Sequence, residues 1–210
     1  MRGLHIRDGG NLRWRSGRIE APNGAAGVAA DGYAVQLLLA ADVRLDGVTV
    51  TSARIGVAIQ DAQRITIADS KLWRFRADGI NASRVDGLTI TRNSFSEAQP
   101  ATGDHSDALQ VRNGVRNLTV TYNTVRGASQ GLAQMDAPGD AALANVVVEY
   151  NDVAVDAYHP ITFGNCINCR VRFNKVQRAP GSAKKARVIV GPGVAECGNV
   201  AQDAVSPPCL

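Results

Sequence analysis

Seven ten-residue segments of the chain follow one pattern, and this repetition restricts the possible folds more than any other feature. The last eight positions of each segment read apolar, polar, apolar, two variable residues, a turn residue, any residue, apolar. The segments are residues 10–19, 46–55, 63–72, 86–95, 116–125, 144–153 and 167–176. Units of this kind bury a continuous core only by stacking on their neighbours, so the chain is expected to be a solenoid.

Stacking the repeats in register would place three columns of apolar side chains in the core. The first column contains Leu12, Val48, Ile65, Leu88, Leu118, Val146 and Cys169. The second contains Trp14, Val50, Ile67, Ile90, Val120, Val148 and Val171, and the third contains Ile19, Ile55, Leu72, Phe95, Val125, Val153 and Val176. The turn position holds Gly17, Ala53, Ser70, Asn93, Asn123, Asn151 and Asn174. Asn and Gly tolerate the left-handed backbone conformation, so we expect them to adopt it at a sharp bend.

A second strand precedes each repeat, and its leading apolar residue recurs along the chain. These leading residues are Leu4, Val57, Ile80, Leu109, Leu132 and Ile161. Alternation with a period of two and no helical period predicts an all-β, single-stranded right-handed parallel β-helix of about seven coils, spaced by roughly 4.8 Å. We expect the solenoid to occupy residues 1–190 and residues 191–210 to form an irregular tail that could cap the last coil.

Charge and composition limit the partners of such a solenoid. The formal net charge is +4, but the 23 basic residues are interleaved with 19 acidic ones, and the longest basic run is Lys184-Lys185. This balance favours an acidic polysaccharide over nucleic acid. No apolar stretch approaches the roughly 18 residues that span a bilayer, so membrane insertion is not expected. No signal peptide is visible after Met1, and the expected location is extracellular, periplasmic or a virion surface.

The four cysteines, Cys166, Cys169, Cys197 and Cys209, allow two readings. Their number fits two disulfides, and their C-x2-C plus C-x11-C spacing fits a four-thiolate zinc site. Because Cys169 belongs to the first apolar column, a buried thiol or a disulfide is favoured over zinc.

The chain resembles the pectate-lyase-like right-handed β-helix superfamily over nearly all of residues 3–190. The stretch GDHSDALQ at 103–110, with QGL at 130–132, is similar to little-characterised bacterial and phage β-helix repeat proteins, although Ser106 replaces an expected Pro. The segments ADGIN and SDALQ resemble a polygalacturonase strand, which would map its first Asp onto Asp78 and Asp107. That family's D-D, G-H-G and R-I-K elements are missing here, which argues against hydrolysis of that type.

One column of the predicted solenoid is polar in four middle coils. Asp78, Asp107, Gln130 and His159 each lie two residues before a leading residue of the second strand. Two carboxylates one strand spacing apart repel each other unless they share a proton, bind a cation or face a basic group. The candidate catalytic residues are therefore Asp78, His105, Asp107 and His159, and the candidate substrate-binding residues are Asn81, Gln110, Arg112, Gln130 and Tyr158. Asp78, Asp104 and Asp107 could bind Ca2+, the one cofactor that this set suggests.

Long insertions follow Phe95 and the strand led by Leu132, and loops on neighbouring coils can form the walls of a groove. Such a groove would suit glycoside hydrolysis by two carboxylates or elimination from a uronic acid. The polar residues could instead only satisfy turn backbone. The sequence therefore predicts recognition, with cleavage left open, of an acidic or cell-surface polysaccharide. The alternative is a non-catalytic structural or adhesion protein, such as a phage tail spike or fibre segment.

The N-terminal strand starts almost at Met1, because Leu4 is already in register with Leu12. The first strand of a parallel β-helix exposes unpaired backbone donors and acceptors. We therefore expect residues 1–10 to dock against another chain, as in a homotrimer, or to continue a β-helix of a longer polypeptide.

Overall fold

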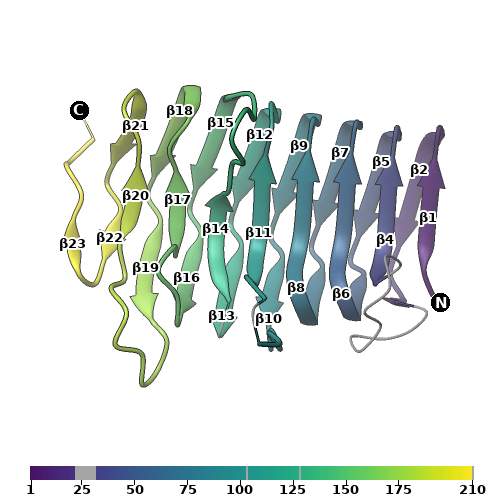
Figure 1. The fold of residues 1–210 in the computed structure, drawn as a ribbon, viewed down its shortest axis with the longest axis horizontal. Helices are drawn as coiled ribbons and strands as arrows, with labels where there is room; N and C mark the ends of the chain where they lie inside the picture. The colour runs from purple at the N-terminus through teal and green to yellow at the C-terminus, as the bar shows by residue number, and fades with distance from the viewer. Residues whose placement is uncertain (22–31, 103, 128, 210) are drawn as a thin grey trace.

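The computed structural model describes residues 1–21, 32–102, 104–127 and 129–209, and all regular elements in these ranges are strands. The strands stack into a parallel β-solenoid with the two termini at opposite ends (Figure 1). The predicted all-β parallel solenoid is therefore confirmed. Within the described ranges, no helix is long and apolar enough to cross a membrane.

One sheet contains eight parallel strands in the order β2-β5-β7-β9-β12-β15-β18-β21. Their bounds are β2 (Gly10–Arg15), β5 (Ala41–Asp46), β7 (Gln63–Ala68), β9 (Asp86–Thr91), β12 (Arg116–Thr121), β15 (Leu143–Glu149), β18 (Cys166–Arg172) and β21 (Val194–Cys197). This sheet contains the first and second apolar columns, whose side chains point into the solenoid.

The other sheet has 15 strands in two runs, which join because β6 (Thr49–Gln60) and β8 (Lys71–Ser83) take part in both. One run holds the leading residues, in β1 (Leu4–Arg7), β4 (Tyr33–Leu38), β6, β8, β11 (Asp107–Arg112), β14 (Gln130–Gln134), β17 (Ile161–Phe163) and β20 (Val188–Val190). The second run holds the third column, in β3 (Arg18–Glu20), β6, β8, β10 (Ser94–Ser96), β13 (Thr124–Gly127), β16 (Asp152–Val155), β19 (Lys175–Arg178) and β22 (Val200–Ala201), and ends at the antiparallel β23 (Ala204–Val205).

The predicted apolar columns are confirmed except in one coil. Strand pairing places Val43 and Leu45, not Val48 and Val50, beside Ile65 and Ile67. Val50 belongs to the third column, and Ile55 pairs with Asp78. The assignment of residues 46–55 as a repeat was wrong because the apolar alternation of this coil begins five positions earlier, at residues 41–50, where Val48 occupies the position that holds a turn residue in the other coils.

The turn asparagines do not have the left-handed conformation that the sequence suggested. Positive φ is found one residue earlier, for example at Arg92 (54°) and Tyr122 (57°). The asparagine side chains instead form a buried ladder, in which Asn93 N and Nδ2 donate to Asn123 Oδ1 at 2.9 and 3.1 Å. We call this the asparagine ladder, and its members are Asn93, Asn123, Asn151, Asn174 and Asn199.

The C-terminal region is more regular than expected. Strand β21 continues the parallel pairing with β18, and β22 and β23 form an antiparallel pair. Disulfides join Cys166 to Cys169 and Cys197 to Cys209, so the zinc alternative is wrong. The boundary at residue 190 stays a prediction. At the other end, β1 pairs with β4 and β2 with β5, which leaves the outer edges of β1 and β2 without a strand partner among the described residues.

Candidate functional site

The predicted polar column exists in the structure. Asp107 pairs with Asp78 on one side and Gln130 on the other, and the His159 backbone N–H donates to Gln130 Oε1 at 2.9 Å. The column lies where the chain turns a corner before the second strand. Gly79 belongs to this corner, where an added Cβ would lie 2.6 Å from the Ala108 carbonyl oxygen. Glycine at this position therefore allows the neighbouring backbone to approach closely beside Asp78 and Asp107.

The two carboxyl groups of the column are buried. Asp107 is 0% exposed, and neither of its carboxyl oxygens has a hydrogen-bond partner among the described residues. Burial, and then the charge of Asp78, raises the pKa of Asp107 to about 8. Burial also raises the pKa of Asp78 to about 6, opposed by hydrogen bonds from Asn81 and from the Asp107 backbone. Near neutral pH Asp107 therefore keeps its proton, and the pair carries a single negative charge.

An amide pair extends from Asp78 along the outer face of the sheet. Asn81 Nδ2 donates to Asp78 Oδ2 at 2.7 Å and also to Gln110 Oε1. Both amides are half-buried, and their strands β8 and β11 are adjacent. The structure thus brings together two of the predicted substrate-binding residues beside Asp78.

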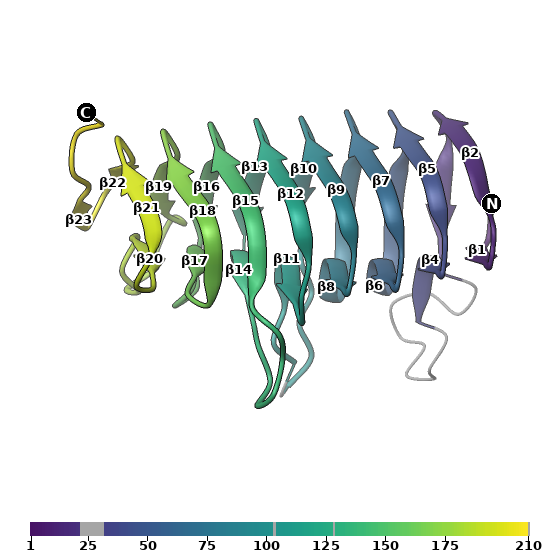
Figure 2. The same cartoon turned by 90° about the horizontal axis from the view of Figure 1, so that it is seen from above.

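Two insertions border this face at opposite ends of the strands. Residues 97–106 precede β11, and residues 135–142 follow β14, where Asp140 lies 3.3 Å from Arg112. Figure 2 shows both connections extending beyond the strands. Arg112, a predicted substrate-binding residue, is therefore ion-paired at the far end of β11, and the length of the strand separates it from Asp107.

A hollow of about 300 Å³ opens beside the polar column. His105, Gln130 and Tyr158 line it, so it gathers one predicted catalytic and two predicted substrate-binding residues. His159 lies next to it, with Nδ1 3.3 Å from Thr162 Oγ1. Burial, with smaller contributions from the charges of Arg187 and His105, lowers the pKa of His159, which is therefore neutral at physiological pH.

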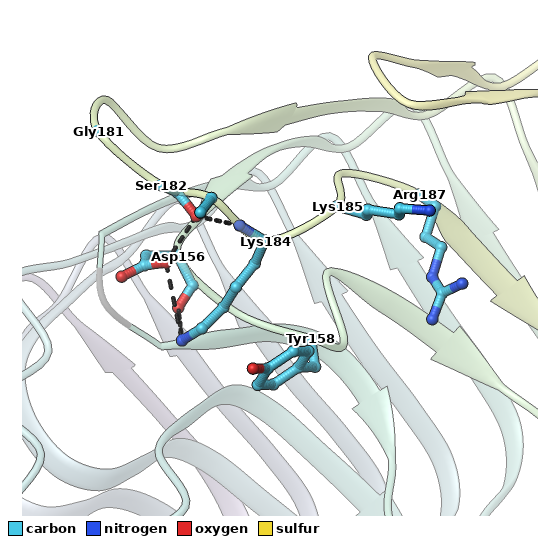
Figure 3. Close-up of a pocket in the computed structure, with 8 residues that line it drawn as sticks. Asp156, Tyr158, Gly181, Ser182, Lys184, Lys185 and Arg187 are labelled. Carbon is cyan, nitrogen blue, oxygen red and sulfur yellow. Dashed lines mark hydrogen bonds and ion pairs between the residues drawn. The ribbon is translucent and has the colours of Figure 1, made fainter.

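A second hollow, of about 630 Å³, adjoins the first through Asp156, Tyr158 and Lys184 (Figure 3). Its far wall is residues 181–187, which we call the basic loop. Lys184 Nζ lies 5.1 Å from the centroid of the Tyr158 ring and donates to the Asp156 carbonyl oxygen at 3.1 Å. We call the two hollows together the basic groove.

The basic loop brings three cations to the groove, and Lys185 and Arg187 have no ion-pair partner among the described residues. Ser182 Oγ fixes the loop by donating to Asp156 Oδ1 at 2.6 Å. Sequence reasoning did not place these cations in the site. The sequence signal for these cations was the basic run Lys184-Lys185, which lies just before β20.

The predicted calcium ligands are not gathered around one point. Asp104 Oδ2 lies 2.8 Å from Arg76 Nε and accepts from the Ala101 backbone N–H at 3.1 Å. In the described part of the chain, no group of three or more His, Cys, Asp or Glu side chains is arranged to hold a metal ion. These residues do not fit a calcium site as arranged, and the proposed Ca2+ stays an untested prediction.

Comparison with known proteins bears on the fold. The family described as a right handed beta helix region matches residues 2–148. The Dettilon tailspike protein superposes with a TM-score of 0.65 at 12% identity, covering 94% of this chain and 48% of the tailspike chain. An alginate lyase from a Paenibacillus species gives a TM-score of 0.35 at 12% identity, over 92% of this chain and 90% of the lyase. No curated protein matches the sequence. The chain spans about half the length of the tailspike, and the likeness to it is one of fold.

Proposed function

We propose that this chain, which belongs to the right-handed β-helix family, binds an acidic polysaccharide in the basic groove. The observation that carries the proposal is that Lys185 and Arg187, which have no ion-pair partner among the described residues, line the same open cavity as the 66% exposed ring of Tyr158. Carboxylates bind Lys and Arg through charge-assisted hydrogen bonds, and an exposed tyrosine offers both an apolar ring and a hydroxyl to a sugar.

The charge distribution supports a glycan over nucleic acid. Many of the described arginines outside the groove are neutralised by a nearby carboxylate, such as Arg64 by Asp42 at 2.6 Å and Arg92 by Asp69 at 2.7 Å. A continuous basic track of the kind that follows a phosphate backbone would need these cations to be free. Lys185 and Arg187 lie two residues apart in the basic loop and have no ion-pair partner among the described residues, which suits a ligand with spaced carboxylates.

Cleavage would be a further step, and the groove suits elimination better than hydrolysis. A retaining or inverting hydrolase needs both carboxyl groups to reach the sugar, but Asp107 is fully buried. In elimination, Lys185 and Arg187 would neutralise the uronate carboxylate while His105 or Tyr158 takes the C5 proton. The C4–O glycosidic bond then breaks as the C4=C5 double bond forms, and the leaving oxygen takes a proton from that residue or from water. Asp78, Asp107 and His159 would then support the groove rather than touch the reacting atoms.

A non-catalytic role as a spike or fibre segment is the second candidate. The observation that favours it is the outer edge of β1 and β2, which has no strand partner among the described residues and can pair with another copy of the chain, a neighbouring chain or a further stretch of a longer polypeptide. Such an assembly would function at a cell surface, in the periplasm or on a virion. A solution mass measurement that gives a trimer, with slow amide exchange in residues 4–7, would support this candidate.

The binding proposal is tested by replacing Lys185 and Arg187 with Ala in one variant. Calorimetry with oligogalacturonate is expected to show at least about tenfold weaker binding, and dextran oligosaccharides are expected not to bind. Lys175→Ala, an exposed lysine of β19 outside the groove, is the matched control and should bind as the wild type does. Unsaturated sugar ends in the product would indicate elimination. Unchanged oligogalacturonate binding in the double variant would place the site elsewhere.

A further inference from the structure

We infer that the basic groove continues toward the N-terminal end into an uncharged subsite for a neutral sugar, so that the ligand contains both neutral and acidic sugars. The inference rests on the proposed function and adds the composition of the ligand. The subsite is a hollow of about 130 Å³ whose polar lining includes Tyr33, Gln36, Gln60 and Asn81. We call it the amide subsite.

The hollow is a consequence of the strand register. Gln36, Ala58, Asn81 and Gln110 occupy one outward-facing column across β4, β6, β8 and β11. The short side chain of Ala58 lies between two longer amides and leaves space between them. The described residues that line this space carry no charge, in contrast to the basic loop.

The hydrogen bonds of the amides leave groups that match a sugar. Asn81 Nδ2 is used by Asp78 and Gln110, which leaves Asn81 Oδ1 free, and the Gln36 amide that lines the same hollow also has no hydrogen-bond partner among the described residues. One free acceptor beside one free donor can bind neighbouring hydroxyl groups, each of which both donates and accepts. A uronate carboxylate would find no cation in the lining and would lie near the Asp78 carboxyl, so a neutral sugar is favoured.

The two subsites lie on the same run of strands, with the amide subsite over β4, β6 and β8. The basic groove begins at Gln130 of β14 and His105 just before β11, and it ends at the basic loop before β20. Figure 1 shows these strands side by side along the solenoid. At roughly 4.8 Å for each strand spacing, a ligand that reaches from β6 to β17 spans roughly 19 Å. An extended oligosaccharide that crosses the strands can therefore contact both subsites.

The test compares three kinds of probe. Oligogalacturonate contains only acidic sugars, dextran oligosaccharides contain only neutral sugars, and oligosaccharides from gellan or hyaluronan contain both and are called the mixed probes. Gln36→Ala, and Ala58→Leu, which fills the hollow, are expected to weaken binding of a mixed probe about 5- to 10-fold. Both should leave oligogalacturonate binding unchanged. Gln177→Ala, at an exposed glutamine of β19, is the matched control, and melting temperatures verify folding.

The outcomes separate this inference from the proposed function. If oligogalacturonate binds as tightly as the mixed probes, or if Gln36→Ala and Ala58→Leu change nothing, the amide subsite is wrong while the basic groove stands. If these two variants weaken a mixed probe but the Lys185 and Arg187 double variant does not, the amide subsite stands and the basic groove is wrong. If none of the probes binds, both are wrong.

Discussion

Two columns of stacked polar side chains run along this solenoid, and they differ in how their hydrogen-bonding groups are satisfied. In the asparagine ladder, Asn123 Nδ2 donates to the Ile90 carbonyl oxygen, and Asn123 Oδ1 accepts from the preceding rung, Asn93. In the polar column, Gln130 Oε1 also accepts a backbone N–H, but from the following coil, at His159. Asp107 breaks the pattern, because Gln130 N donates to the Ser106 carbonyl oxygen at 2.6 Å and not to the Asp107 carboxyl group.

The contrast shows which side chains allow a stacked polar column to stabilise the solenoid. An asparagine side chain has both donors and an acceptor, so each rung can satisfy its own backbone and its neighbour. An ionised carboxylate only accepts, and a buried one without a donor is costly. Asp107 therefore stays protonated in a place where an amide would be more stable. Because Asp107 lies beside the basic groove, we interpret the free-energy cost of burying its carboxyl group as one that the fold tolerates near a functional site.

The largest effect is expected from placing a carboxylate in the asparagine ladder by Asn123→Asp. The variant loses the donors to Ile90 O and to Asn151 Oδ1, and at pH 8 it buries a charge facing carbonyl oxygens. We expect a loss of about 3–5 kcal/mol in the free energy of unfolding, measured by urea denaturation. Asn168→Asp, at an exposed position, is the control and should cost less than about 1 kcal/mol. If Asn123→Asp costs no more than Asn168→Asp, the asparagine ladder accepts a carboxylate as the polar column does, and the proposed difference between the two columns is wrong.

The reverse exchange, Asp107→Asn, is expected to change how stability depends on pH. The folded pKa of about 8 lies above the ordinary value of 3.8, so the folded state retains a proton that the unfolded chain releases. The contribution of Asp107 is complete below about pH 4 and is lost as the pH rises toward 8. We expect the wild type to lose roughly 1–3 kcal/mol between pH 5 and 8, and Asp107→Asn to lose less.

Asp69→Asn serves as a control of opposite sign. The side-chain hydrogen bond from Arg92 lowers the pKa of the exposed Asp69, so its contribution is present above the ordinary pKa and is lost as the pH falls. Removing it should leave the decline between pH 5 and 8 intact. Equal slopes in the wild type and in Asp107→Asn would show that Asp107 is ionised and solvated in the folded protein.

The sequence predicted the core because each coil repeats the same alternation ahead of a turn residue. Leu88, Leu118 and Val146 are paired as expected. The coil of Val43 was misread because alternation alone does not mark where a strand ends and a turn begins. The asparagines were correctly placed at turns, but their role is to bind the neighbouring rung rather than to supply a left-handed residue.

The sequence predicted the parts of the candidate site that depend on strand register, but not the parts that depend on burial. Register placed Asp78, Asp107, Gln130 and His159 in one column, as the pairing confirms. The burial of the Asp78 and Asp107 carboxyl groups is not marked in the sequence, because the same column holds half-buried side chains at Gln130 and His159. The cations of the basic loop lie in residues 181–187, where no alternation defines a register that would bring them to the groove.

The smallest effect is expected from Gln130→Ala, and it decides whether the polar column is a ladder at all. The change removes the acceptor of the His159 backbone N–H, which should cost about 1 kcal/mol because water in the adjoining hollow can partly replace it. Gln130→Glu keeps an acceptor at this point, so its His159 rung should remain bonded while its negative charge weakens oligogalacturonate binding. Amide hydrogen exchange at His159 measures the bond directly and is expected to be faster in Gln130→Ala than in the wild type or Gln130→Glu. If all three exchange at the same rate, the side chain does not hold the rung, and the stacking of Asp78, Asp107 and Gln130 reflects strand pairing alone.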